Sequence, residues 1–260
     1  MHHIVLKYRR FGINRTIEHQ AASEWNELNE KQLLEVLRLI STSTKVKEFR
    51  LHIVKLLLDL SWFQFKLVNT VQFIQLFDYF RWIEEGISLT RCPIKILLKT
   101  YYGPADELSG FTGLEWILAD DAYIRYRDGE ENALDELIAV LYRPLDPETS
   151  SHDKRETFNS NALEHRAKFL AQVDPLKKLA ILRFYESCRQ EWEQIYHRVF
   201  SGVESNAENY GWAEVFLAIA ESGSLGDLEK IEQTPITTIF LKMQVDHKNY
   251  EQFKAKNQLK

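Results

Sequence analysis

The stretch that decides the fold is GFTGLEWILADDAYIRYRDGEENALDELIAVLYRP, residues 110–144. Thr112 and Glu115 have the spacing of a capping box. In this motif the hydroxyl accepts a hydrogen bond from the N3 amide, and the carboxylate accepts one from the N-cap amide. Apolar residues then recur at helical spacing as far as the turn Asp128-Gly129. A second amphipathic segment ends before Pro144, because proline cannot continue a helix. The stretch therefore predicts two consecutive helices, and we expect their apolar sides to join the cores of the two halves of the chain.

The composition indicates a folded, water-soluble protein. Hydrophobic residues make up 45% and aromatic residues 12% of the 260 residues, which predicts a sizeable core and excludes global disorder. The formal net charge of −5 argues against a polyanionic partner, so nucleic acid is an unlikely ligand. The apolar runs are much shorter than the ~20 residues of a membrane span, and the N-terminal residues lack the pattern of a signal peptide. Cys92 and Cys188 show no paired spacing. We expect a cytoplasmic protein with reduced thiols.

The chain as a whole predicts a mainly α-helical protein with bundle-like packing of many helices. The first residues differ from the rest, because Ile4 to Phe11 suits a pleated surface and Gly12 with Asn14 can turn the chain back. This pattern predicts a short N-terminal β-hairpin or an edge strand. Its basic residues are Lys7, Arg9, Arg10 and Arg15. Charges that protect a strand edge are the favoured interpretation, and a docking arm for an acidic partner or nucleic acid is the alternative.

Breaks in the helical pattern predict the domain organisation. We expect a hairpin or arm at 1–20, an N-terminal helical domain at 21–144, a polar linker at 145–161 and a C-terminal helical domain at 162–260. Pro144 and Pro147 flank the start of the linker and its centre is polar, which is typical of a flexible loop. The alternative is a single core shared by both helical segments.

One predicted helix, from Trp62 to about Ile83, is unusually aromatic. Aromatic side chains dominate both cores and partner-binding surfaces, so this density fits either use. A core is favoured, because apolar residues surround most of the helix. The candidate partner-binding residues in this segment are Trp62, Phe65, Phe73, Phe77 and Trp82.

An acidic stretch follows. Between Tyr102 and Glu136 the sequence has ten acidic residues against two arginines, Arg125 and Arg127. A solvated acidic face is the favoured interpretation, followed by a docking face for a basic partner and then by a metal site. The adjacent pair Asp120-Asp121 diverges by about 100° on a helix, which does not favour a shared ion. We take Asp120 and Asp121 as candidate partner-binding residues, together with Trp212 on the apolar face of a later helix.

The sequence contains no motif that announces a chemistry. Neither GxxxxGK nor GxGxxG occurs, and the only Gly-Ser-x-Gly run does not follow a strand. None of the eight histidines has a glutamate three residues before it, which argues against a helical di-metal site. We therefore predict no catalytic, cofactor-binding or metal-binding residues, no cofactor, and a protein that is not an enzyme. A site formed between distant helices is the alternative that sequence cannot test.

Three stretches carry a resemblance to a known group of proteins. They are SEWNELNEKQLLEVLRLI (23–40), GFTGLEWILADDAYIRY with LDELIAVLYRP (110–144), and GWAEVFLAIAESGSLGDLEKIEQTPITTIF (211–240). These stretches resemble proteins encoded in the tail-gene regions of phages and prophages of Bacteroidetes. The last stretch is also similar to the C-terminal parts of tail assembly chaperones, in which a Trp-led helix, a small-residue kink and a short acidic helix precede the final helix.

The resemblance implies a role without catalysis in the cytoplasm of the bacterial host. Such a protein binds a tape-measure protein or another tail component during virion assembly. The basic hairpin has no counterpart in the chaperone pattern, which leaves open a structural component whose strand adds to a partner's sheet. A host-encoded helical scaffolding or regulatory protein-interaction module is the alternative function. The oligomeric state cannot be read from the sequence.

Overall fold

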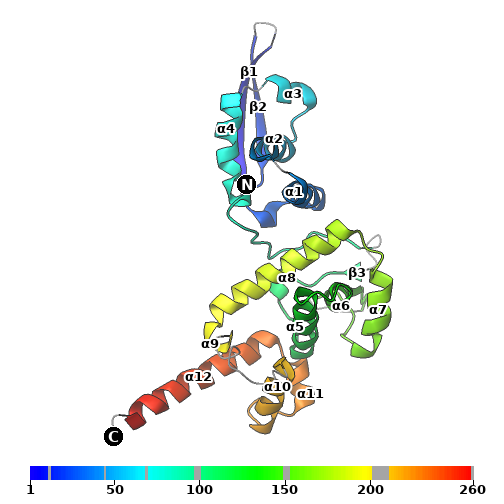
Figure 1. Cartoon of the computed structure of the whole chain (residues 1–260), viewed down its shortest axis with the longest axis vertical. Helices are drawn as coiled ribbons and strands as arrows, with labels where there is room; N and C mark the ends of the chain where they lie inside the picture. The colour runs from blue at the N-terminus through cyan, green and yellow to red at the C-terminus, as the bar shows by residue number, and fades with distance from the viewer. Residues whose placement is uncertain are drawn as a thin grey trace. The chain divides into compact units, whose positions relative to one another are not determined.

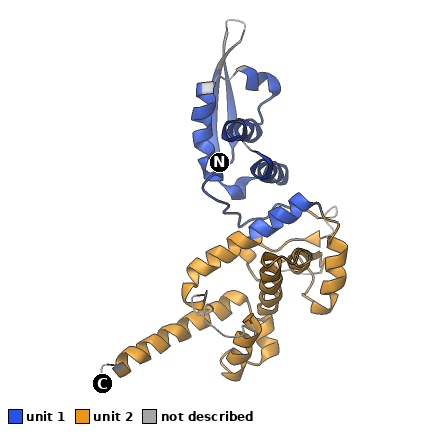
Figure 2. Ribbon diagram, in the orientation of Figure 1, with its two compact units in different colours: residues 1–94, 174–184 blue, residues 95–173, 185–260 orange. Residues whose placement is uncertain are grey.

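The computed structural model describes residues 1–10, 13–43, 45–67, 70–96, 101–148, 153–200 and 211–258. This part of the chain forms twelve α-helices and two antiparallel two-stranded sheets (Figure 1). The predicted fold class, mainly α with an N-terminal hairpin, is confirmed. The chain forms two compact units: unit 1 contains residues 1–94 and 174–184, and unit 2 contains residues 95–173 and 185–260 (Figure 2).

Unit 1 begins with the predicted hairpin. Strand β1 (His2–Arg10) pairs with β2 (Ile13–Ala21), from His2 opposite Ala21 to Arg10 opposite Ile13. Ile4 and Ala21 are buried, whereas Val5 is exposed. Because successive side chains of a strand alternate between its faces, one face of the sheet contributes to the core and the other faces solvent.

Short helices complete unit 1. They are η1 (Trp25–Glu27), α1 (Glu30–Thr42), α2 (Val46–Leu57), α3 (Trp62–Leu67), α4 (Thr70–Phe77), η2 (Asp78–Ile83) and the first part of α8 (Pro175–Ile195). The predicted single helix from Trp62 to about Ile83 is wrong at its end, because α4 is followed directly by the tighter η2 at Asp78; residues 68 and 69, between α3 and α4, lie outside the described residues.

Unit 2 contains the remaining elements. They are β3 (Tyr101–Tyr102), η4 (Asp106–Leu108), α5 (Gly113–Arg127), α6 (Ala133–Leu141), β4 (Arg143–Pro144), η5 (Ser160–Ala162), α7 (Leu163–Leu170), the second part of α8, α9 (His197–Phe200), α10 (Gly211–Glu221), α11 (Leu228–Gln233) and α12 (Ile236–Gln258). Strand β3 pairs with β4.

The two helices predicted from residues 110–144 are confirmed as α5 and α6. The amide of Glu115 donates to Thr112 Oγ1 (3.4 Å), and the amide of Thr112 donates to Glu115 Oε2 (2.9 Å), which is the predicted capping box. Gly129 follows α5 with φ +103°, a conformation that favours glycine. Both helices belong to unit 2, which also contains the C-terminal helices α10, α11 and α12. The contacts of α5 with those helices therefore lie inside one compact unit.

The start of α5 is packed closely against the C-terminal segment. The amide of Gly113 donates to the carbonyl of Thr234 (2.9 Å), and the amide of Ile236 donates to the carbonyl of Phe111 (2.8 Å). A Cβ atom on Gly113 would lie 2.6 Å from the Phe216 ring, so only glycine fits this approach.

The two compact units have bounds that differ from those of the domains expected from the sequence. The expected linker at 145–161 lies inside unit 2.

Candidate partner-binding site

An apolar groove of about 480 Å³ lies between α2 and α4 of unit 1, and we call it the α2–α4 groove. Its lining residues are Val46, Lys47, Arg50, Leu51, Phe73, Ile74, Phe77, Asp78 and Arg81. Phe73 and Phe77 form a buried floor, with 7% and 3% of their surface exposed, whereas Val46 and Ile74 are each 63% exposed at the rim. Exposed aliphatic residues above an aromatic floor form a surface that can receive the apolar face of a partner helix.

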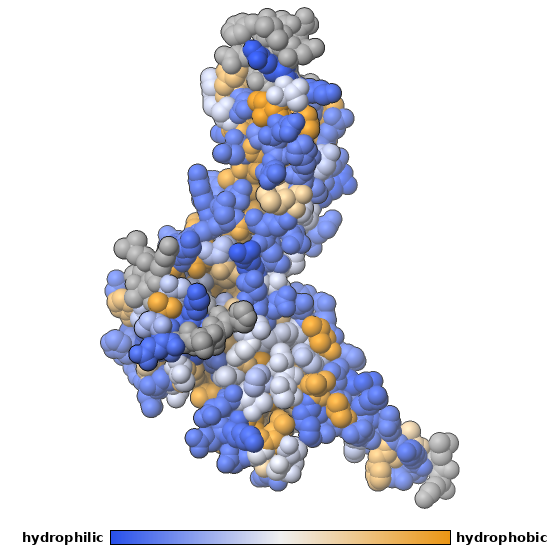
Figure 3. Space-filling model, turned by 180° about the vertical axis from the view of Figure 1, so that it is seen from behind, coloured by the Kyte–Doolittle hydropathy of each residue, from blue (hydrophilic) through white to orange (hydrophobic). Residues whose placement is uncertain are grey.

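The surface of unit 1 exposes several large hydrophobic residues besides those of this groove. Figure 3 shows hydrophobic residues that interrupt the hydrophilic surface in the upper part of the molecule, which is unit 1. The exposed large hydrophobic residues of β1 and α1 to η2 are Val5, Ile40, Val46, Trp62, Phe63, Val71, Ile74 and Tyr79. Single exposed apolar residues need no explanation, but several on neighbouring helices indicate an interaction surface.

The charges of the α2–α4 groove are mostly positive. Its lining contains Lys47, Arg50 and Arg81 against a single carboxylate, Asp78. Arg50 binds Glu84 through two hydrogen bonds of 3.0 and 2.8 Å, and its guanidinium lies 4.8 Å from the centroid of the Phe77 ring. These contacts hold Arg50 beside the floor of the groove. Arg81 in turn pairs with Asp78 (2.7 Å), so Lys47 is the lining cation that remains to favour a partner with an acidic face.

The five aromatic candidates predicted from sequence have different surroundings. Phe73 and Phe77 line the groove, and the Phe65 ring lies 4.9 Å from that of Phe73. Trp62 is 64% exposed on α3, where Lys66 Nζ lies 3.7 Å from its ring centroid. Trp82 instead packs edge-to-face on the buried Trp25, at 5.4 Å between centroids, and so contributes to the core.

Asp120 is a buried residue, and the expectation that it lies on a solvated acidic face is wrong. Only 1% of its surface is exposed. Its Oδ1 accepts hydrogen bonds from Arg189 Nε (2.6 Å) and the Tyr185 hydroxyl (3.2 Å), and its Oδ2 accepts one from Trp212 Nε1 (2.8 Å). Trp212, another candidate, is therefore also a core residue. Burial raises the pKa of Tyr185 well above its ordinary value, and the negative charge of Asp120 adds to this shift.

Asp121, in contrast, is exposed. It binds Arg125 Nε at 2.9 Å, and Arg125 also binds Glu130 and Glu136. Other acidic residues of the stretch are neutralised by arginines that are distant in sequence, such as Arg189 beside Asp120. The exposed surface of α5 is consequently less acidic than the sequence count indicates.

Sequence reasoning missed a buried ionic cluster formed by Glu115, Arg143, Asp153 and Arg155. Glu115 Oε1 lies 2.8 Å from Arg143 Nη2 and 3.3 Å from Arg155 Nη2, and Arg155 Nη2 lies 2.6 Å from Asp153 Oδ2. The Arg155 side chain has no exposed surface. Two of the four residues belong to the stretch 145–161, so its described part holds core residues and the expected flexible linker is wrong there.

Arg155 of this cluster and the neighbouring Arg166 provide hydrogen bonds to the end of α6. Arg155 Nη1 donates to the carbonyl of Leu141 (2.9 Å), and Arg166 Nη1 donates to the carbonyl of Ala139 (3.0 Å). Carbonyl groups in the last turn of a helix lack partners within the helix, and cations there also offset the negative end of the helix dipole. The cluster therefore has a structural role in joining α5, α6 and the following loop.

Two groups of the ionic cluster have shifted pKa values. Burial lowers the pKa of Arg143 to about 10, although the charge of Glu115 opposes this shift. Burial raises the pKa of Asp153, but its hydrogen bonds with Arg155 and the charges of Arg155 and Arg143 together lower the pKa by more than burial raises it. The net shift of the pKa is therefore downward. Asp153 therefore stays ionised to lower pH than an ordinary aspartate.

The described ranges contain no group of three or more His, Cys, Asp or Glu residues placed to hold a metal ion. Within the same ranges, no helix is long and apolar enough to cross a membrane. Cys92 and Cys188 do not form disulfides.

No protein-family model, curated protein or solved structure matches the chain.

Proposed function

We propose that this chain is a phage or prophage protein that acts in tail assembly, without catalysis, in the cytoplasm of the bacterial host. It binds a tape-measure protein or another tail component through the α2–α4 groove. The observation that carries this proposal is the pairing of a buried aromatic floor, Phe73 and Phe77, with the exposed rim residues Val46 and Ile74. The resemblance of three stretches to tail-region proteins supports the choice of partner.

The groove favours a helical partner with one apolar and one acidic side. Lining residues of α2 recur at i, i+1, i+4 and i+5 and those of α4 at i, i+1 and i+4, so each helix presents one face to the groove. Burial of Val46 and Ile74 against a partner contributes about 1–2 kcal/mol each, since both are largely exposed in the free chain. Lys47 attracts an acidic residue beside the apolar face of the partner, whereas Arg50 and Arg81 are paired with Glu84 and Asp78.

Co-expression tests the proposal. The full chain is produced with the tape-measure-like product encoded beside it, and the pair is purified through a tag on one partner and then by size exclusion. We expect a complex, and we expect Ile74→Asp to weaken it about tenfold or more, because a charge in the groove loses more than ~1.4 kcal/mol. The matched control is Val245→Asp on α12 of unit 2, at a residue that is 45% exposed.

Two results contradict the proposal. One is a chain that elutes alone with no tail component bound, and the other is equal binding by Ile74→Asp and wild type. A gene neighbourhood without virion genes favours the host-encoded scaffolding or regulatory module, which leaves the groove as its binding surface but changes the partner.

A further inference from the structure

The second half of α12 in unit 2 is a helix that the rest of the described chain leaves uncovered. Figure 1 shows α12 continuing past the other helices of its unit. Every residue from Lys248 to Asn257 is exposed. Isolated helices shorter than about 12–15 residues are marginal in water, and packing of an apolar face supplies most of the stability of a helix in a protein. A partner that covers this segment would therefore stabilise it.

The apolar face of α12 continues from the covered half of the helix into the uncovered half. Ile236 and Ile239 are fully buried in unit 2. Tyr250 and Phe253 occur two seven-residue repeats further along, at the same positions of the repeat, a and d. Met243 is the a position between them. Tyr250 and Phe253 are 56% and 63% exposed, so the stripe that packs on unit 2 at one end is bare at the other.

The positions that flank Tyr250 and Phe253 in this repeat, e and g, are basic or uncharged. Lys254 Nζ lies 4.7 Å from the centroid of the Tyr250 ring, and Lys256 is exposed. Charges at e and g set the choice of partner in coiled coils, so the two lysines favour acidic positions in a partner helix. The flanking residues are His247, Asn249, Lys254 and Lys256.

We propose that the second half of α12 binds an amphipathic helix of a second partner protein. The partner helix packs its apolar stripe on Tyr250 and Phe253 and places aspartate or glutamate beside Lys254 and Lys256. The two helices form a short coiled coil, in which each a and d side chain inserts between side chains of the facing helix. This surface belongs to unit 2 and shares no residue with the α2–α4 groove, so it does not depend on the binding proposed there.

A second copy of this chain lacks the complementary charges. The e and g positions of the copy carry the same residues, so neither parallel nor antiparallel pairing brings a carboxylate to Lys254 or Lys256. The acidic residue of the segment 248–257 is Glu251, which is at position b and lies 3.7 Å from Arg198 Nε of α9. Like charges at the flanking positions disfavour self-pairing and leave a different protein as the partner.

An anionic membrane surface also fits this helix less well. A helix that lies in a membrane interface has a broad apolar face, whereas Tyr250 and Phe253 form a narrow seam of a and d positions. The next a position is Asn257. A polar residue at one a position fixes the register of coiled coils, which favours a partner helix over a lipid surface.

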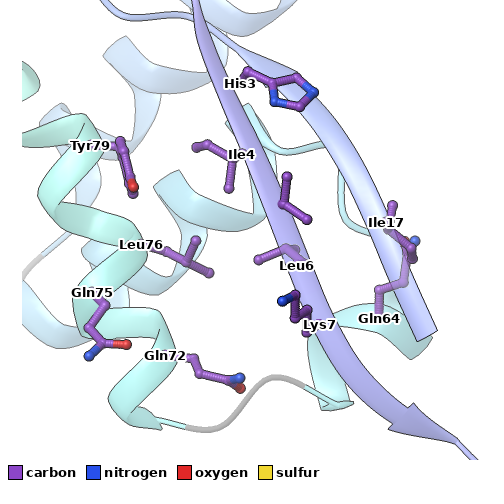
Figure 4. Close-up of a pocket in the computed structure, with 11 residues that line it drawn as sticks. His3, Ile4, Leu6, Lys7, Ile17, Gln64, Gln72, Gln75, Leu76 and Tyr79 are labelled. Carbon is purple, nitrogen blue, oxygen red and sulfur yellow. The ribbon is translucent and has the colours of Figure 1, made fainter. Parts of the chain in front are cut away.

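The cavity beside the N-terminal sheet shows no comparable preference (Figure 4). It has a volume of about 330 Å³ and is lined by residues of β1, β2, α3 and α4. Lys7 is the only lysine or arginine among its described lining residues, and the lining mixes apolar side chains with the uncharged Gln64, Gln72 and Gln75. Such a lining selects no class of partner, in contrast to the basic seam of α12.

Peptide selection tests the proposal on the full chain. A library of helical peptides of about three heptads, with positions a, d, e and g randomised, is displayed on yeast and selected on the immobilised protein. We expect the selected peptides to carry apolar residues at a and d and glutamate or aspartate at e and g. Fluorescence anisotropy then measures the affinity of the best peptide for wild type and for two pairs of matched variants.

Each pair compares the seam of α12 with another side of the same helix. Phe253→Ala should weaken binding about tenfold or more, whereas Val245→Ala, at position c, should leave it unchanged. Lys256→Glu replaces attraction with repulsion and should weaken binding about threefold or more. Lys248→Glu makes the same charge change at position f and should have no effect. All four side chains are exposed, and matching thermal melts verify that the variants fold.

Amide hydrogen exchange with the best peptide bound locates the contact. We expect slower exchange in residues 248–257, because a covered helix opens less often. The proposal is overturned if no peptide is selected or if the selected e and g positions are not acidic. It is also overturned if Phe253→Ala and Lys256→Glu bind as well as their controls, or if residues 248–257 gain no protection.

Two further results would replace the proposed partner. Phosphatidylserine vesicles that bind wild type more tightly than the best peptide does, and that lose Phe253→Ala, would assign the helix to a membrane surface. A dimer of the free chain in sedimentation velocity that Phe253→Ala dissociates would assign it to a second copy. We expect neither, since the seam is narrow and its flanking positions lack carboxylates.

Discussion

An aromatic cluster of unit 2 is buried, whereas the aromatic helix α3 of unit 1 exposes two of its rings. In unit 2, Trp116 has no exposed surface, and its ring centroid lies 5.3–6.2 Å from those of five other aromatic residues. These residues are Tyr185, Trp192, Phe200, Trp212 and Phe240. In unit 1, Trp62 and Phe63 of the aromatic helix α3 are 64% and 42% exposed. High aromatic content alone therefore does not distinguish a core from a binding surface.

Polar partners account for part of this difference. The indole N–H of Trp212 donates a hydrogen bond to Asp120, which also accepts hydrogen bonds from Tyr185 and Arg189. The carboxylate beside the aromatic cluster of unit 2 therefore has three hydrogen-bond donors. A buried carboxylate is tolerated when several donors satisfy it. Trp62 has instead a lysine over its ring at the surface, an arrangement that a partner can displace or extend.

Replacement of the central aromatic residue should have the largest effect. We expect Trp116→Ala to lower the free energy of unfolding by about 3–5 kcal/mol, because it leaves a cavity among five rings. Trp62→Ala should change it by less than about 0.5 kcal/mol, since this side chain is mostly exposed. Urea unfolding followed by circular dichroism measures both values. Equal losses in the two variants would remove the contrast between the units.

The ionic cluster gives the next prediction. Arg155→Met should cost about 3 kcal/mol, because Glu115 loses one of its two cations and the carbonyl of Leu141 loses its partner. Lys154→Met, at the exposed neighbouring residue, should be close to neutral. The same urea titration compares them. If Arg155→Met were also neutral, the stretch 145–161 would behave as the flexible linker that its composition indicates.

Two adjacent carboxylates provide a smaller and closely matched comparison. Asp120→Asn should cost about 2 kcal/mol, because the amide keeps the size of the side chain but loses the attraction to Arg189. Asp121→Asn should cost less than about 0.5 kcal/mol, since the Asp121–Arg125 pair is exposed to solvent. Thermal melts at pH 7 distinguish the two. A larger loss of stability in Asp121→Asn than in Asp120→Asn would contradict the assignment of Asp120 as the buried carboxylate.

The smallest effect concerns pH. The pKa of Asp153 is lowered in the folded chain, so its contribution to stability is present above the pKa of an unfolded aspartate, about 4. That contribution is lost as the pH falls from about 4 through the lowered value of the folded state. Stability measured by urea unfolding between pH 7 and pH 2 should therefore decline less steeply in Asp153→Asn than in wild type. Parallel curves would show that Asp153 is not held by the two arginines.

Local patterns in the sequence predicted the elements but not the sites. Capping at Thr112 depends on residues within one turn, so the start of α5 was predictable. The pairing of Glu115 with Arg155 depends on tertiary packing, and no spacing rule reveals it. Phe73 and Phe77 were identified from aromatic density, but the rim residue Val46 belongs to another helix.

The most direct test of the central claim, that unit 1 binds the partner while the aromatic cluster of unit 2 serves as a core, is the amide hydrogen exchange of the complex with the tail component. We predict that binding slows exchange in α2 and α4 around the α2–α4 groove and leaves α5, α10 and α12 unchanged. Protection centred on the helices of unit 2, with α2 and α4 unaffected, would contradict it.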